Sequence, residues 1–179
     1  MMILEEKGSG WSRRVGGLLL VVAFVGSGCT DLTSQDDRFT EDPDDVQFAP
    51  SLGIDLDDFE DHPAGLLYRL DAFGEGPEAS PGAEIEVAMT GWLPSGEVFA
   101  EWDSVDPLSF VLGQPQFEVV AGVHEGVNGM VTGEIRTLVV PPYLGYGGAP
   151  PPDSGVPTHS WLVYRVELVT VDGQGGGPD

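Results

Sequence analysis

The segment covering residues 139–168 constrains the fold of this chain more than any other part of the sequence. It starts as an apolar run that ends in a Pro-Pro pair, and an aromatic, glycine-rich turn follows at residues 143–148. A loop rich in proline and glycine continues to Pro157, and an apolar segment of β character follows it at residues 161–168. Because the loop between the two apolar segments is long and stiff, they are not expected to form a simple hairpin. We predict instead that the two strands and the loop form one wall of an apolar pocket.

The composition is consistent with one folded domain and excludes nucleic acid as a partner. The chain has 179 residues, 41% of them apolar, which suits a core in one domain of about 100–150 residues plus appendages. Thirty acidic residues stand against seven basic ones, for a formal net charge of −23. Such a surface repels DNA, RNA and anionic lipid head groups. The acidity itself fits either solubility or a salty habitat, where screening weakens self-repulsion.

Residues 1–28 predict a signal peptide. Three basic residues precede an apolar run of about ten residues, which is too short to span a bilayer at about twenty. Small residues then lead to Cys29, the only cysteine, which therefore cannot form an internal disulfide. This layout resembles a bacterial lipoprotein signal, although Gly26 stands where that signal prefers Leu or Val. The resemblance implies a lipid on Cys29 and a lipid-anchored place in the bacterial cell envelope. An ordinary signal peptide or a short buried helix is the alternative.

Residues 29–63 predict an acidic, disordered tether that holds the domain away from the membrane. Twelve carboxylates stand there against one base, Arg38. A segment of this composition buries too little apolar surface to offset its chain entropy. Closely spaced carboxylates could instead bind calcium, but the residue pattern of a calcium-binding loop is missing, which favours the tether.

The remaining sequence predicts an α+β domain over residues 64–172, in which a bent antiparallel sheet wraps around one short α-helix. The helix is expected within residues 117–130, where valines recur near helical spacing. Three glycines weaken it, so it must be short and stabilised by packing. Residues 173–179 predict a frayed tail. The expected strands cover residues 65–73, 84–93, 97–100 continued by 107–112, 134–140 and 159–171.

Several motifs, in this order, resemble the FKBP-type peptidyl-prolyl isomerases. They are a G-L-x-Y strand at residue 65, a hairpin that ends at Phe99, a Tyr-Gly turn at Tyr146 and a Val-Pro pair before the last strand. The resemblance covers about residues 65–171. It implies the FKBP fold and an enzyme that interconverts the cis and trans forms of X-Pro bonds.

That reaction places unusual demands on a protein. Amide resonance gives the bond a barrier of roughly 18–20 kcal/mol, and uncatalysed exchange takes tens to hundreds of seconds. No nucleophile, metal or general base is required. An apolar, dry, aromatic pocket favours the twisted amide over the more polar planar form, and a few hydrogen-bond donors hold the flanking carbonyl groups. The aromatic and apolar residues of this chain satisfy these requirements, and we expect no cofactor.

The resemblance also implies which residues form the pocket, although each apolar one, taken singly, fits an ordinary core position as well. The Val120 amide and the Tyr146 hydroxyl are expected to bind substrate carbonyl groups. Other positions are expected to contact the substrate without this role. The catalytic set is Phe99, Val119, Val120, Tyr146 and Tyr164, and the substrate-binding set is Met89, Leu108, Val123 and Val156.

Some of these positions depart from the family pattern. Met89 replaces a tyrosine and Ala100 replaces an aspartate, and the loss of both predicts reduced activity. Leu108 and Val123 stand where larger pocket residues are usual. Glu101 is expected to point to the other face of its strand and therefore not to substitute for the aspartate.

Other chemistries find little support in the sequence. The spacing of His62, His124 and His159 fits no metal-ligand pattern, so solvated histidines are the favoured interpretation. The G-x-S-x-G motif of a serine hydrolase is missing. We therefore predict a monomeric isomerase whose clients are X-Pro-containing envelope or secreted polypeptides. The alternative is a catalytically weak or inactive module of the same fold that binds proline-containing or unfolded segments.

Overall fold

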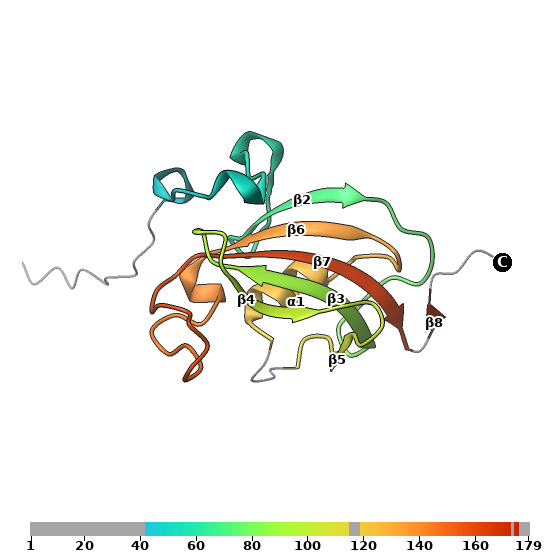
Figure 1. Ribbon diagram of the computed structural model, residues 1–179. Coiled ribbons are helices and arrows are strands. Elements are labelled where there is room, and N and C mark those ends of the chain that lie inside the picture. Colours follow the sequence, from blue (N-terminus) through green and yellow to red (C-terminus); the bar gives the residue numbers. More distant parts are fainter. Residues whose placement is uncertain (1–41, 115–118, 173, 176–179) are drawn as a thin grey trace, which may run out of the picture. The chain divides into compact units, whose positions relative to one another are not determined.

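The structure is a computed structural model that describes residues 42–114, 119–172 and 174–175 (Figure 1). Its antiparallel sheet has the strand order β1-β2-β6-β7-β3-β4, with β5 beside β3 and β8 beside β7. The strands are β1 (Glu60–Asp61), β2 (Leu67–Ala72), β3 (Glu84–Trp92), β4 (Val98–Trp102), β5 (Leu108–Val111), β6 (Ile135–Val140), β7 (Leu162–Val171) and β8 (Gln174–Gly175). The one α-helix of the described residues, α1 (Ala121–Val127), lies behind the strands in Figure 1. The predicted architecture is confirmed.

Two long central strands carry most of the core. Strand β3 alternates buried and half-buried residues along its length, and β7 does so over most of its length. Ile85 and Val87 of β3 and Val166 and Leu168 of β7 are fully buried on the concave face, which packs against α1. This period of two is what the strand pleat requires when one face is covered.

Irregular pairing bends the sheet. The register shifts between Leu70 and Ala72, between Glu86 and Val87, and between Gly91 and Trp92. Such irregularities bend a strand and increase its local twist. The return from β3 is split as predicted, because β4 pairs with the end of β3 and β5 pairs with its beginning.

The glycines of α1 weaken the helix but let it approach the sheet. Gly122 and Gly126 are one helical turn apart and face β6. A Cβ atom on Gly126 would lie 2.5 Å from Leu138 Cδ1, and one on Gly122 would collide with Val140 Cγ1. The predicted helix is therefore confirmed as short and stabilised by packing. It covers residues 121–127, while residues 115–118 of the predicted span lie outside the described part of the chain.

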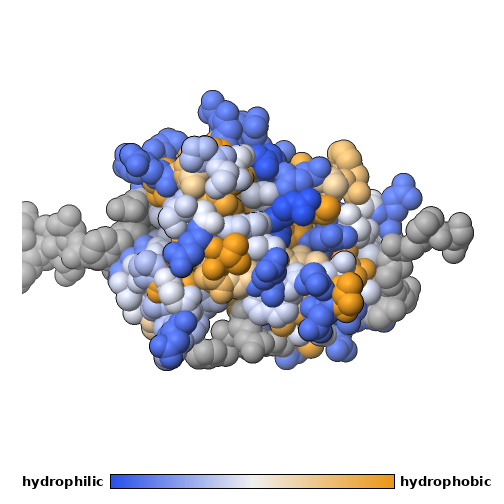
Figure 2. Space-filling view, in the orientation of Figure 1, coloured by the Kyte–Doolittle hydropathy of each residue, from blue (hydrophilic) through white to orange (hydrophobic). Residues whose placement is uncertain are grey.

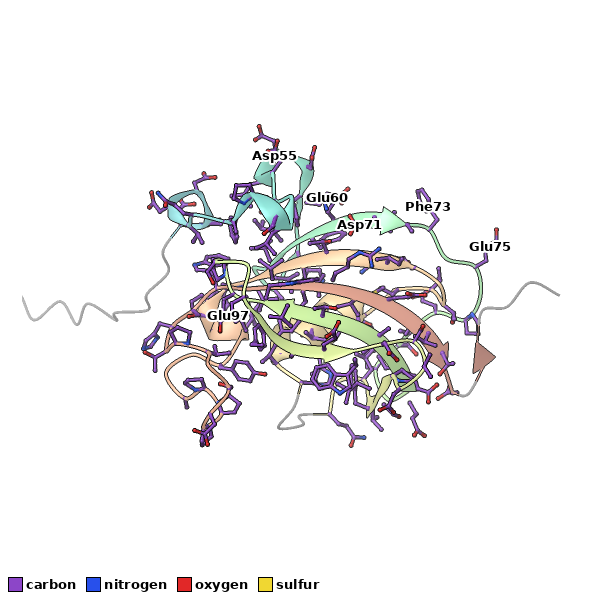
Figure 3. All side chains as sticks on the ribbon, in the orientation of Figure 1. Asp55, Glu60, Asp71, Phe73, Glu75 and Glu97 are labelled. Carbon is purple, nitrogen blue, oxygen red and sulfur yellow. The ribbon has the colours of Figure 1, made fainter. Side chains whose placement is uncertain are left out.

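The expectation of an extended tether up to residue 63 is wrong for the described residues 42–63. Three 3-10 turns, Pro43–Asp45, Pro50–Leu52 and Leu56–Asp58, lead to β1, which pairs with β2. The Ala49 amide donates to the Pro94 carbonyl at 2.8 Å. Glu60 of β1 accepts from the Tyr68 hydroxyl of β2 at 2.7 Å, and Figure 3 labels Asp55 and Glu60 in this segment.

The physical reason is a second layer of apolar contacts on the outer face of the sheet. Val139 and Val163 point away from the core beside α1, yet they are 0% and 2% exposed. Leu52 of the second turn lies at the same cavity as Val163, and the guanidinium of Arg69 stacks on the Phe59 ring at 4.9 Å. Apolar residues between the acids thus give the segment surface to bury, which the overall charge concealed.

The ends of the chain are described in part. The predicted signal peptide, Cys29 and residues 30–41 of the predicted tether lie outside the described residues. Within the predicted frayed tail, Gln174–Gly175 pair with Thr170 and Val171 of β7, so that expectation is wrong for these two residues. Among the helices of the described part, none is long and apolar enough to cross a membrane.

Candidate active site

Three aromatic side chains from separate elements meet on the concave side of the sheet. The Phe99 ring of β4 contacts the Tyr164 ring of β7 edge-on, with centroids 5.6 Å apart and planes at 79°. It also contacts Tyr146, which follows the 3-10 turn Pro142–Leu144, at 6.3 Å and 77°. Edge-to-face contacts of this kind are favourable for aromatic pairs. The sequence named all three residues, and the structure brings them together.

A glycine makes this aromatic cluster possible. Gly91 of β3 is paired with Tyr164 on one side and with Ala100 on the other. A Cβ atom on Gly91 would lie 2.8 Å from Phe99 Cζ and 2.9 Å from Tyr164 Cε1. Any larger residue would therefore displace two of the three rings. The sequence analysis did not single out Gly91, because its role depends on neighbours from two other strands.

The two tyrosines of the cluster interact through their hydroxyl groups. Burial raises the pKa of Tyr164 well above its ordinary value, and the Tyr146 hydroxyl raises it further. Burial also raises the pKa of Tyr146, while the hydrogen bond with Tyr164 opposes that shift. These directions indicate that the two hydroxyl groups lie close enough to influence each other.

The beginning of α1 borders this region. Val119 and Val120 are 4% and 7% exposed and belong to the core cluster. Val120 is the residue before the first helical turn, with extended dihedral angles, and its carbonyl accepts from the Val123 amide at 3.0 Å. The helix therefore fixes the backbone of the residue whose N–H is expected to bind substrate.

The four predicted substrate-binding residues all lie in the apolar core. Met89, Leu108, Val123 and Val156 are at most 9% exposed. Contact of these side chains with a substrate stays a prediction. Glu101 is exposed and pairs with Thr90, at a hollow on the outer face, so the expectation that it cannot replace the missing aspartate is confirmed.

His124 differs from its prediction as a solvated side chain. It is 8% exposed on α1, its ring meets Phe110 edge-on at 5.0 Å, and its Nδ1 accepts from the Gly113 amide at 3.2 Å. Burial lowers the pKa of His124, with Glu125 opposing the shift. Its Nε2 is buried without a hydrogen-bond partner. The sequence does contain a signal for this burial, because Val120 and Val127 lie four residues before and three residues after His124, on the same face of a helix.

Over the described residues, no group of three potential metal ligands occurs.

Fold and site together define a domain with an aromatic cluster on the concave side of a bent sheet. The family model of the FKBP-type peptidyl-prolyl cis-trans isomerases matches residues 76–169, more than half of the chain. The chain therefore belongs to this family.

Individual relatives agree with this assignment. An FK506-binding protein of Neisseria meningitidis serogroup B is 41% identical over 108 residues, which are 60% of this chain and 96% of that protein. FK506-binding protein 4 of Mycosarcoma maydis is 38% identical over 109 residues, which are 61% of this chain and 28% of that protein. The chain thus matches only about a quarter of the fungal relative's length.

Solved structures show the same fold. The crystal structure of FkpA from Escherichia coli has a TM-score of 0.57 and 30% identity, covering 72% of this chain and 56% of that chain. The peptidyl-prolyl cis-trans isomerase of Pseudomonas syringae pv. tomato has a TM-score of 0.56 and 27% identity, covering 64% of this chain and 80% of that one.

Proposed function

We propose that this protein catalyses cis/trans isomerisation of X-Pro bonds in polypeptide clients. The observation that carries the proposal is the convergence of Phe99, Tyr146 and Tyr164 around Gly91, beside the start of α1. The rings supply an apolar surface for the pyrrolidine ring of proline. Removing water from the amide lowers the advantage of its planar, more polar form.

Two donors would orient the substrate. The Tyr146 hydroxyl, which interacts with the Tyr164 hydroxyl, would donate to a carbonyl group of the substrate. The Val120 amide is held at the beginning of α1 and would bind a second carbonyl group. Fixing both flanking carbonyl groups leaves rotation about the X-Pro bond as the remaining freedom. None of these groups has to transfer a proton.

A coupled peptide assay with X-Pro peptides that differ in X tests this function. The full chain is expected to accelerate isomerisation, and Tyr146→Phe is expected to lower kcat/KM about tenfold, since a hydrogen bond of about 1–1.5 kcal/mol is lost. Tyr143→Phe is the matched control, because Tyr143 is 52% exposed and its hydroxyl donates to the Ala64 and Gly65 carbonyls. Absence of acceleration by the folded chain would contradict the proposal.

A binding module without useful turnover is the second candidate. It is favoured by Met89 and Ala100, which leave the pocket without a carboxylate at these positions. The double variant Met89→Tyr with Ala100→Asp separates the two candidates. If the protein is an enzyme, turnover should rise several-fold. If it is only a binding module, peptide binding should persist with turnover at the background rate.

We also propose that the protein acts at the bacterial cell envelope, anchored by a lipid on Cys29 and assisting the folding of envelope or secreted proteins. The order of the basic residues, the apolar run and the single cysteine in residues 1–29 supports this. Cys29→Ser should release the protein from membranes during fractionation. Unchanged membrane association of that variant would exclude the lipid anchor.

A further inference from the structure

The outer face of the sheet carries a cavity that is separate from the aromatic cluster. It has a volume of about 430 Å³ and lies between the second 3-10 turn, residues 50–52, and strands β2, β6, β7 and β3. This outer-face cavity is within the range of about 300–1,000 Å³ that is typical of ligand sites. Figure 2, in the orientation of Figure 1, shows hydrophilic residues interleaved with small hydrophobic patches.

Two arginines approach this cavity from neighbouring strands. Thr137 of β6 is paired with Arg69 of β2 on one side and with Arg165 of β7 on the other. All three residues line the cavity. The pairing places the two guanidinium groups on either side of one threonine, on the same face of the sheet.

The two arginines differ in their partners. Arg69 is fixed, because its Nε donates to Asp71 at 2.8 Å and its Nη1 donates to the Gly53 carbonyl at 3.2 Å. The other oxygen of Asp71, which is labelled in Figure 3, accepts from the Thr137 hydroxyl at 2.5 Å. The side chain of Arg165 has no hydrogen bond or ion pair in the described part of the chain. The cavity thus holds one fixed guanidinium and one without a partner.

The charge of the chain makes this arrangement notable. The described residues contain three arginines and no lysine, in a chain with a net charge of −23. The third, Arg136, is occupied by Glu134 and the Gly126 carbonyl. Two of the three cations therefore meet at one cavity, and only one carboxylate, Asp71, lies there with them. Within this cavity the two guanidinium groups outnumber the carboxylate, whereas a neighbouring hollow that Arg165 also lines carries Glu101, Asp103 and Glu167.

The wall of the cavity beside Arg165 is aromatic. Trp92 of β3 lines the outer-face cavity and also a neighbouring hollow of about 400 Å³, which Arg165 shares. A guanidinium binds a carboxylate through two parallel hydrogen bonds, and an indole ring offers a flat apolar surface next to it. Polyanions would be repelled by the surrounding acids, so a ligand with a single negative charge fits best.

We propose that the outer-face cavity binds a carboxylate that carries an apolar group, with the carboxylate between Arg165 and Arg69 and the apolar group against Trp92. The ligand is the size of one or two amino-acid residues. The carboxylate could belong to the C-terminus of a polypeptide or to an acidic side chain. The site lies on the opposite face from the aromatic cluster, so it is independent of isomerisation.

The test follows the indole N–H signal of Trp92 by NMR in the full chain, assigned with Trp92→Phe. N-acetyl-leucine should shift this signal saturably, and N-acetyl-leucinamide, which has no carboxylate, should not. Arg165→Gln should weaken the binding at least tenfold without lowering Tm, because Arg165 has no partner to lose. Tyr146→Phe is the control on the opposite face and should leave the binding unchanged.

A third probe, N-acetyl-aspartic acid α-amide, presents only a side-chain carboxylate. Tighter binding of N-acetyl-leucine would assign the site to C-terminal carboxylates, and tighter binding of the aspartate derivative would assign it to acidic side chains. Equal shifts with the acid and the amide of leucine would overturn the proposal. So would unchanged affinity in Arg165→Gln, or binding of neither carboxylate.

Discussion

The two faces of the sheet bury apolar residues for different purposes. On the concave face, Val123 of α1 is completely buried, in the same core against which Phe99 and Tyr146 pack. On the outer face, Val139 is just as buried, and on this face Leu52 of a highly acidic segment lines one cavity with Val163. The comparison teaches that burial alone does not identify a functional face. The arrangement of aromatic and hydrogen-bonding groups does.

The largest effect is expected where the helix touches the concave face. Gly122→Ala places a methyl group against Val140, whose β-branched side chain cannot rotate freely away. Overpacking should lower the free energy of unfolding by about 1–3 kcal/mol, reduced by the better helix propensity of alanine. Denaturant unfolding measures this. Glu125→Ala, an exposed position of the same helix, is the control and should lose no stability, whereas equal stability of both variants would contradict the close packing of α1.

A matched pair of valines compares the faces directly. Val123→Ala and Val139→Ala remove the same atoms from two fully buried positions, so each should cost about 1.5–2 kcal/mol of stability. Only Val123→Ala should also reduce kcat/KM, because it alone lies beneath the pocket. If Val139→Ala costs nothing in an unfolding experiment, the acidic segment does not form a second packed layer.

A smaller effect is expected for the hydroxyl pair. Tyr164→Phe removes the hydroxyl group that interacts with Tyr146 and keeps the ring that packs on Phe99, so kcat/KM should fall several-fold, about 1 kcal/mol. The pKa of Tyr146, followed by ultraviolet titration, should rise in this variant because an opposing hydrogen bond is lost. An unchanged Tyr146 titration would show that the two hydroxyl groups do not interact.

The smallest effect concerns His124 and acidic pH. Because burial lowers the pKa of His124 in the folded state below its ordinary value of 6.5, the unfolded chain binds a proton first as the pH falls. The contribution of neutral His124 to stability is therefore present above about pH 6.5 and is lost progressively below it. His124→Gln should flatten the pH dependence of the unfolding free energy in this range, and an unchanged pH dependence in this variant would exclude His124 as its source.

Much of the fold could be predicted because the evidence for it is local. The alternation in β3 and β7 marks their buried face directly, and the Pro-Pro pair with the Tyr-Gly turn marks the loop that carries Tyr146. The membership of Phe99, Tyr146 and Tyr164 in one site came from resemblance to a family. The prediction of disorder was wrong for residues 42–63, because it was based on the many carboxylates of this segment and gave too little weight to the apolar residues between them.

The sequence by itself determined the strands, the short helix of the described residues and the stiff aromatic loop, because periodicity and turn chemistry act over a few neighbouring residues. Only the tertiary structure decided why Gly91, Gly122 and Gly126 must be small, that His124 is buried, and that Arg69 and Arg165 flank one cavity. Each of these facts depends on strands distant in sequence that become neighbours through pairing and packing, and no local pattern encodes which atoms then meet.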